Sequence, residues 1–319
     1  MDALSHLLSL YPVQTSLDTR CRGTTPYSMD HVERGRGTAP YHLIVEGGAV
    51  LHVAGRSPLP LLAGDMLVLP HGPAHTLHIG GNAADGASAD VLCGQFHFGD
   101  AAGTLVSALP EVVLVRTAGK QEFLGLQALV NLLRDESVAA RPGASAVVSH
   151  LASALLALIL RAWLLQADTI PGLFALLADQ RLAPVLQQML TAPGKTWTLP
   201  QLAALCNMSR ATFLRNFRKV SGGTPGEVLM HIRMAQAAQW LGQTHRGVAE
   251  VGAAVGYQSE AAFNRAFKRH MGEGPGQYRR EVSAAGTQGD GDSSTRQPVS
   301  ASRMTSPIQS TKALTVGDR

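Results

Sequence analysis

Two stretches near the C-terminal end of the chain share one pattern of apolar and polar positions. In each, a short apolar run precedes a turn, and the turn precedes a run in which two phenylalanines stand four positions apart. The shared positions are Ser209, Phe213, Phe217 and Pro225, which recur 50 positions later as Ser259, Phe263, Phe267 and Pro275. A repeat of this length marks a duplicated structural unit. The pattern predicts two helix-turn-helix units, in each of which a serine caps the second helix and glycine or proline ends it.

The second helix of each unit is predicted to carry a basic face opposite its phenylalanines. Because a helix turns about 100° per residue, the phenylalanines form one buried stripe and leave small and basic side chains on the other side. On that side stand Ala211, Arg215, Arg218 and Lys219 in the first unit, and Ala261, Arg265, Lys268 and Arg269 in the second. Small side chains let a helix approach the DNA major groove, so Arg215 and Arg265 are predicted to reach guanine and the later basic residues to meet phosphate. A solvated charged face without a ligand is the alternative.

The charge of the chain is divided in the same way. Residues 181–281 hold 13 Lys and Arg against 5 Asp and Glu, whereas residues 1–180 hold 10 against 15. A basic domain beside an acidic one is expected where only the basic part meets a polyanion. We therefore expect double-stranded DNA to be the partner of the C-terminal part.

The pattern ahead of the repeats changes from strands to helices. Residues 1–118 hold short alternating runs between glycines and prolines, such as Tyr41 to Val45, which predict strands. Residues 119–178 predict helices, including one over Ala144–Gln166. The apolar run within that helix, over 151–160, is too short to span a bilayer, so we expect it to be buried or to pair two subunits.

At 319 residues the chain is long enough for two domains. We expect an α+β protein with a β-rich domain over 1–118, a helical linker over 119–178, a DNA-binding domain over 179–282 and a tail over 283–319. The tail is rich in Gly, Ser, Thr and Gln and is predicted to be disordered. The opening residues lack the order of a signal peptide, so we expect a cytoplasmic protein without a membrane partner, whose cysteines are thiols at rest.

Residues 179–281 resemble the AraC family of bacterial transcription regulators. The resemblance rests on the run from Ile232 to Leu241, on the run from Val248 to Arg269, and on the Gly-Pro pair that follows the second run. It implies two helix-turn-helix units that are held by one long helix and enter adjacent major grooves. It also implies that bases are read by Ala211, Leu214 and Arg215 in the first unit and by Ala261, Asn264 and Arg265 in the second.

The segment from Gly64 to His75 resembles the second signature motif of the cupin β-barrel, in which Gly and five residues precede Pro-x-Gly-x-x-His. The resemblance implies a cupin-like β-barrel that acts as a sensor domain. His42 and Glu46 stand at the spacing of the earlier cupin motif, although its paired His-x-His is missing. Imidazole and carboxylate suit zinc, iron or manganese, so His42, Glu46 and His75 are candidate metal ligands. Ordinary hydrogen-bonding residues at the mouth of the barrel, with no cofactor, are the alternative.

Two cysteines form a candidate redox pair. Cys21 is flanked by Arg20 and Arg22, whose charges favour the thiolate. A thiolate that meets hypochlorous acid or peroxide gives a sulfenyl species, which condenses with a second thiol. Cys93 is the candidate partner, since Cys206 stands in the other domain. The opening residues also resemble the reactive-chlorine-responsive activators of the AraC family, which implies a sensing role for Cys21 and Cys93; a buried apolar Cys93 and an idle Cys21 are the alternatives.

Together these patterns predict a transcription regulator, with activation favoured over repression. RNA polymerase is then a further expected partner, and a homodimer through the apolar helix is one option. The sensor domain is expected to respond to oxidants through its cysteines, or alternatively to a small organic effector or metal in the barrel. No Ser/His/Asp arrangement or phosphate-binding loop occurs in the sequence, so we do not expect an enzyme.

Overall fold

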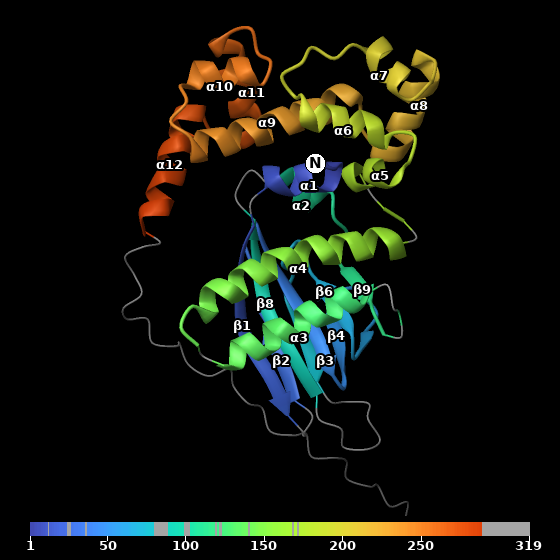
Figure 1. The fold of residues 1–319 in the computed structure, drawn as a ribbon, viewed down its shortest axis with the longest axis vertical. Coiled ribbons are helices and arrows are strands. Elements are labelled where there is room, and N and C mark those ends of the chain that lie inside the picture. Colours follow the sequence, from blue (N-terminus) through green and yellow to red (C-terminus); the bar gives the residue numbers. More distant parts are fainter. Residues whose placement is uncertain are drawn as a thin grey trace, which may run out of the picture.

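The computed structural model describes residues 1–11, 13–23, 27–35, 37–79, 89–98, 103–118, 120, 123–139, 141–167, 169–170 and 172–288. For residues 17–23 and 284–288 it describes the backbone alone. All described strands lie ahead of α3 (Leu124–Ala139), and most helices follow them, so that a β-rich domain and a helical domain are stacked along the long axis of the molecule (Figure 1). The predicted two-domain α+β architecture is confirmed.

The β-rich domain consists of two antiparallel sheets, with strand orders β1-β8-β3-β6-β9 and β2-β7-β4-β5. The described strands are β1 (Val13–Gly23), β2 (Tyr27–His31), β3 (Thr38–Glu46), β4 (Gly48–Val53), β5 (Leu59–Leu62), β6 (Asp65–Val68), β7 (His75–Ile79), β8 (Ala89–Phe98) and β9 (Val113–Arg116). These strands do not close into one hydrogen-bonded barrel, so the predicted barrel takes the form of a two-sheet sandwich.

The interior between the two sheets is mostly apolar. Along β7, buried and half-buried side chains alternate, whereas β3 is buried over six consecutive positions. The difference arises because helices cover the outer face of the first sheet, while one face of the second sheet meets solvent. Leu51, Leu77 and Val91 are among the buried side chains that fill the space between the sheets.

Helices α3 (Leu124–Ala139) and α4 (Ala144–Gln166) cross the outer face of the first sheet (Figure 1). The α4 side chains Leu156 and Ile159 are buried in the core that includes this sheet, so the predicted burial of the apolar run is confirmed on that side. Among the described helices, α4 alone has the length and apolar composition to cross a membrane, with 39% of its most apolar window buried. Core helices of soluble proteins can have the same length and apolar composition, so these two properties alone do not assign α4 to a membrane.

A short helix, α1 (Ala3–Leu10), precedes the first strand, where the sequence analysis predicted only strands. The side chain of Asp2 caps this helix and accepts a hydrogen bond of 2.9 Å from the backbone N–H of Ser5. The helix buries Leu7 and Leu10 and lies between the two domains (Figure 1). The prediction of strands from residue 1 is wrong because an Asp N-cap followed by leucines at helical spacing favours a helix.

Helix α2 (Gly103–Ser107) lies between β8 and β9, so a second helix interrupts the stretch that was predicted as strands. The remaining helices build the C-terminal half and are α5 (Gly172–Ala178), α6 (Ala183–Thr191), α7 (Leu199–Leu205), α8 (Arg210–Ser221), α9 (Pro225–Gln243), α10 (Val248–Ala254), α11 (Glu260–Met271) and α12 (Pro275–Gln288). Helix α12 therefore continues past residue 282, where the sequence analysis ended the DNA-binding domain. Residues 289–319, which make up most of the predicted tail, lie outside the described residues.

The two domains share one hydrophobic core. Phe96 of the first sheet, Trp163 of α4 and Phe217 of α8 belong to the same cluster of buried side chains. Between the domains, the rings of Trp163 and Phe174 meet edge to face with centroids 5.7 Å apart. A shared core lets a displacement in one domain alter the packing of the other.

Candidate DNA-binding surface and sensor site

The two helix-turn-helix units form as the repeat predicts. Ser209 and Ser259 cap α8 and α11, and each side chain accepts a hydrogen bond of 3.3 Å from a backbone N–H three positions later. Gly222 and Gly272 end these helices with φ of 75° and 89°, in the left-handed region that glycine adopts without strain. Each second helix therefore begins and ends at residues that the sequence identifies.

The phenylalanines of both units point inward and the basic side chains outward. Phe213, Phe217, Phe263 and Phe267 are fully buried. The side chains that the sequence analysis assigned to DNA and that the structure exposes are Ala211, Arg215, Arg218, Lys219, Ala261, Arg265, Lys268 and Arg269. Leu214 and Asn264, which only the family resemblance implied, are half-buried, and Leu214 packs against the core.

Helix α9 holds the two units at its opposite ends (Figure 1). Thr224 and Glu227 form a capping box at its start, and Pro225 occupies the first turn. From the middle of α9, the guanidinium group of Arg233 donates hydrogen bonds of 2.8 Å and 3.1 Å to the carbonyl oxygens of Pro193 and Lys195, ahead of the first unit. One long helix thus fixes the spacing of two exposed basic faces, as recognition of adjacent major grooves requires.

A second polar site lies inside the β-rich domain, where two cross-strand pairs face each other across the sandwich. His42 of β3 stands opposite Cys93 of β8 in the first sheet, and His31 of β2 stands opposite His75 of β7 in the second. The rings of His31 and His75 are stacked with centroids 4.5 Å apart, and the His42 ring meets both edge to face. We call these four residues the His–Cys cluster.

Hydrogen bonds connect three members of the cluster in a chain. Nδ1 of His75 lies 2.8 Å from the carbonyl oxygen of Pro73, Nε2 of His75 lies 2.8 Å from Nε2 of His42, and Nδ1 of His42 lies 3.1 Å from Sγ of Cys93. The carbonyl only accepts, so in neutral His75 the proton sits on Nδ1 and Nε2 accepts. His42 then donates from Nε2 and accepts from the Cys93 thiol at Nδ1, a proton assignment that follows from the network.

The surroundings keep these imidazoles neutral. Burial lowers the pKa of His42 well below its usual range, and the nearby His31 and His75 lower it further. Burial also lowers the pKa of His75, although its hydrogen bond to the Pro73 carbonyl opposes this effect. Both rings are therefore neutral at pH 7, as the proton assignment requires.

The structure separates the three metal ligands that the sequence proposed. His42 and His75 meet, but Glu46 is exposed near the far end of β3. Four residues of strand span about 13 Å, so Glu46 does not reach the cluster. His31 and Cys93 lie beside His42 instead. The sequence analysis did not identify His31, because only the long-range pairing of β2 with β7 brings this residue beside His75.

The other histidines of the β-rich domain have partners outside the cluster. His52 and His78, for example, face each other with ring centroids 4.6 Å apart.

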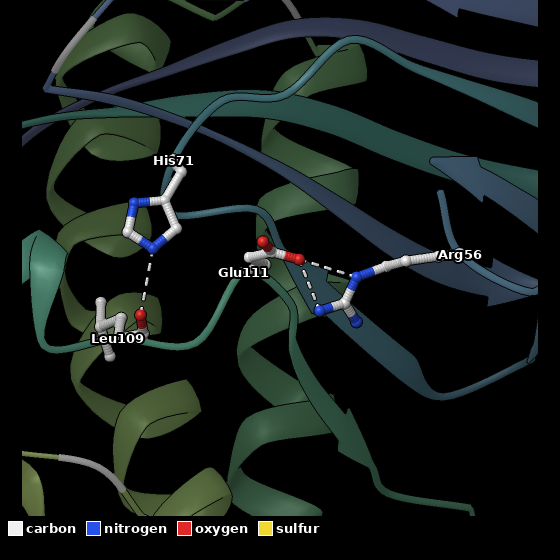
Figure 2. A network of polar contacts seen from close by, with 4 residues as sticks. All are labelled: Arg56, His71, Leu109 and Glu111. Carbon is white, nitrogen blue, oxygen red and sulfur yellow. Dashed lines mark hydrogen bonds and ion pairs between the residues drawn. The ribbon is translucent and has the colours of Figure 1, made fainter. Parts of the chain in front are cut away.

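Two polar contacts hold the segment that leads into β9 against the sandwich (Figure 2). His71 contacts the carbonyl oxygen of Leu109 at 3.1 Å, and Arg56 binds the carboxylate of Glu111 at 2.6 Å.

The candidate redox cysteines belong to adjacent strands. In the pairing of β1 with β8, Thr19 stands opposite Cys93 and Cys21 stands opposite Val91. Cys93 is buried, whereas the side chain of Cys21 lies outside the described residues. Cys206 is half-buried at the end of α7 and packs against the core.

Comparisons with known proteins agree with both domains. A cupin family model matches residues 2–165, and a helix-turn-helix domain model matches residues 202–281. The chain is 34% identical to the "RCS-specific HTH-type transcriptional activator RclR" of Escherichia coli (strain K12), over 88% of this chain and 98% of that protein. It is 32% identical to the "HTH-type transcriptional regulator MtrA" of Neisseria gonorrhoeae, over 88% of this chain and 99% of that protein.

A similar solved structure is the DNA-binding domain of AdpA in complex with a target DNA, at 31% identity and a TM-score of 0.32, covering 34% of this chain and 98% of that one. The similar proteins along the full length are transcription regulators, so the chain is a DNA-binding regulator and not an enzyme. On the strength of its two domains and these relatives, the chain belongs to the AraC family of transcription regulators, with a cupin domain at its N-terminal end.

Proposed function

We propose that this regulator activates transcription in response to hypochlorous acid and related oxidants, through oxidation of Cys21 and Cys93. The observation that carries the proposal is the 3.1 Å contact between Sγ of Cys93 and Nδ1 of His42, because it gives the thiol proton an acceptor inside the sandwich. The similar Escherichia coli protein is named an RCS-specific activator, which supports the same signal for this chain.

The proposed chemistry transfers two electrons from two thiols to one hypochlorous acid. The Cys21 thiolate attacks chlorine, an S–Cl bond forms and hydroxide leaves. The sulfur of Cys93 then attacks that of Cys21, and chloride leaves. The Cys93 proton leaves by way of Nδ1 of His42 and ends on the hydroxide released in the first step. The product is a disulfide that a cellular thiol can reduce again.

A Cys21–Cys93 bond would displace β1. Cys21 is a diagonal neighbour of Cys93 in the register, and diagonal neighbours are about 7–8 Å apart, whereas a disulfide needs Cα atoms about 4.4–6.8 Å apart. Bond formation therefore draws β1 along β8. Helix α1 immediately precedes β1 and contacts α6 and α9 of the helical domain, so the displacement reaches the DNA-binding units.

In the DNA complex, Arg215 and Arg265 read guanine while Arg218, Lys219, Lys268 and Arg269 meet phosphates. The exposure of all six basic side chains on the two second helices supports this assignment. The same proposal includes contact with RNA polymerase at the promoter and a cytoplasmic location. It leaves the exposed part of α4, with Val147 and Leu165, as the surface through which a homodimer would form.

Thiol titration before and after one equivalent of hypochlorous acid tests the proposal, with peptide mapping of any disulfide and promoter affinity measured in parallel. We expect a Cys21–Cys93 linkage that reductant reverses and that changes DNA binding or transcription. Cys206→Ser is the matched control and should behave as the wild type. Thiols that stay reduced, or a disulfide without any effect on DNA function, would reject oxidant sensing.

A cavity of about 240 Å³ supports a second candidate, a small organic effector. Its lining, at one end of the second sheet, consists of Leu51, Val53, Arg56, Ser57, Leu59 and Val112. The lining is mostly apolar and its basic side chain, Arg56, is already paired with Glu111, so the cavity suits a compact, largely apolar organic molecule. Regulation that persists in a Cys21→Ser/Cys93→Ser protein would favour this candidate over cysteine oxidation.

A further inference from the structure

The His–Cys cluster concentrates soft and borderline donors in an apolar interior. Three imidazoles and one thiol converge there, and the buried side chains around them include Leu67, Leu77 and Val91. Such donors select copper, zinc or iron rather than magnesium or calcium. We propose that Cys93, His42 and His31 form a thiolate–imidazole site for a closed-shell metal ion, Cu⁺ or Zn²⁺.

The spacing of the donor atoms fits such a site. One donor atom each from His31, His42 and Cys93 lies within 4.8 Å of the other two. Ligands at the usual Zn–S and Zn–N lengths stand about 3.6 Å apart at a tetrahedral angle, against 3.1 Å between Sγ of Cys93 and Nδ1 of His42. The metal therefore replaces the thiol proton between Sγ of Cys93 and Nδ1 of His42. The lone pairs of both atoms already point toward that position, and the two atoms need to move apart by only about 0.5 Å.

The hydrogen-bond chain orients the His42 ligand. A metal-binding histidine usually donates its other ring N–H to a fixed acceptor, which holds the ring and its tautomer. Here Nε2 of His42 faces Nε2 of His75 at 2.8 Å, and Nδ1 of His75 is held by the Pro73 carbonyl. His75 is thus a positioning residue that leaves Nδ1 of His42 for the metal.

This set differs from the His and Glu ligands that the cupin resemblance implies. Glu46 is exposed and about 13 Å along the strand from His42, so the carboxylate does not take part. Cys93 replaces a hard oxygen donor with a soft sulfur one. The change disfavours manganese and magnesium and favours ions that bind thiolate.

The net charge of the occupied site distinguishes Cu⁺ from Zn²⁺. One thiolate and two neutral imidazoles with Cu⁺ form a site without net charge, whereas Zn²⁺ leaves one positive charge in an apolar interior. Burying an uncompensated charge is costly. A trigonal site of two histidines and one cysteine is also a copper geometry in proteins. We therefore expect Cu⁺ to bind more tightly than Zn²⁺.

Metal binding to the reduced, metal-free full-length protein tests this site. Cu⁺ is titrated anaerobically against a chromophoric chelator and Zn²⁺ against a fluorescent one, while thiolate-to-metal absorption is recorded in the near ultraviolet. The variants are Cys93→Ser, which keeps the size of the side chain and a donor to His42, together with His42→Gln and the half-buried His31→Asn. Cys206→Ser and His78→Gln are matched controls, since neither residue belongs to the cluster.

We expect one ion per chain, with affinity at least about 100-fold weaker in Cys93→Ser and His42→Gln and unchanged in both controls. Circular dichroism and promoter affinity show whether each variant is folded. If His42→Gln does not fold, His31→Asn replaces it as the test of an imidazole ligand. Binding that Cys93→Ser leaves intact, or that the controls lose equally, would overturn the site. Oxidant-dependent DNA binding of the metal-free protein is scored separately, so that either proposal can fail while the other stands.

Discussion

The side-chain amide of Gln239, on the helix that joins the two DNA-binding units, donates a hydrogen bond of 2.7 Å to the carbonyl oxygen of Ser9 in the N-terminal helix. A second amide contact lies nearby, where Gln187 of α6 donates to the carbonyl oxygen of Met1 at 3.0 Å. The first ten residues of the chain are thus bound to the DNA-binding half. The strand that follows them carries one of the two candidate redox cysteines.

This link predicts that Gln239→Ala weakens communication between the domains. One hydrogen bond is worth about 1 kcal/mol, so the free energy of unfolding should fall by about that amount. The difference in promoter affinity between the oxidised and reduced proteins should shrink, while the affinity of the reduced protein stays close to wild type. Titration of labelled promoter DNA measures both affinities.

The exposed Gln277, on α12, provides the matched control for Gln239, because its side chain bonds only within its own helix, to Glu281. Gln277→Ala should leave the oxidised-to-reduced ratio unchanged. An unaltered ratio in Gln239→Ala would show that the N-terminal helix does not carry the signal.

Arg265 and Lys268 lie on the same exposed helix face but are expected to act differently on DNA. Replacing Arg265 with Ala should cost about 1–3 kcal/mol of binding and relax specificity at one base pair, because a bidentate contact with guanine is lost. Replacing Lys268 with Ala should weaken binding equally on all sequences and lower the salt dependence by about one phosphate contact. Binding to a selected operator and to its single-base variants, at several salt concentrations, separates the two effects. Uniform weakening by Arg265→Ala would assign that residue to phosphate.

Arg233 should be a strong determinant of stability in the helical domain. Its guanidinium group satisfies two backbone carbonyls, and a Cβ placed on Gly256, in the turn of the second unit, would lie within 2.8 Å of it. Arg233→Ala should therefore lower the free energy of unfolding by about 1–3 kcal/mol, since two acceptors lose a charged donor. Arg233→Lys should recover only part of the loss, because an ammonium group cannot reproduce the planar fork.

Urea denaturation measures the effect of both Arg233 variants. Arg181 is the control, since its ion pair with Asp179 is mostly exposed on the arginine side, and Arg181→Ala should change stability by less than about 0.5 kcal/mol. Equal losses at positions 181 and 233 would refute the proposed role of Arg233.

The helical domain should become less stable in acid because of a histidine pair. The rings of His231 in α9 and His270 in α11 have centroids 5.0 Å apart. Burial lowers the pKa of each, the charge of His231 adds to the lowering at His270, and Glu227 opposes it at His231. Both pKa values are therefore lower in the folded state than in the unfolded chain, where histidine titrates near 6.5.

The sign of the pH effect follows from these directions. Above about pH 6.5 both states hold the rings neutral and stability is at its full value. As the pH falls below that point the unfolded chain binds protons first, so stability is lost toward the folded-state pKa values. His231→Gln/His270→Gln should therefore show a smaller fall in Tm between pH 7 and pH 5 than the wild type. Parallel curves for the two proteins would contradict the prediction.

The sequence by itself determined the DNA-binding half of the molecule. Serine caps, a phenylalanine stripe at helical spacing and terminal glycines are local signals, and each appears twice, so the repeat marks both units and their exposed basic faces. The alternating pattern between glycines and prolines likewise marked the run from Tyr41 to Val45 as a strand, although it did not reveal α1 or α2. These features depend on neighbours within a few positions, which a linear pattern records.

The tertiary structure alone decided the composition of the sensor site. His31 and Cys93 are 62 positions apart and meet only because β2 and β8 lie on opposite sheets that face each other across one interior. For the same reason Glu46, four positions from His42, is excluded while Cys93 is included. The contact of α1 with α6 and α9 likewise depends on how the domains pack, because no local pattern in the first ten residues specifies a partner more than 170 positions away. Long-range strand pairing and domain packing are properties of the folded chain. They assemble the His–Cys cluster and place α1 against the DNA-binding half.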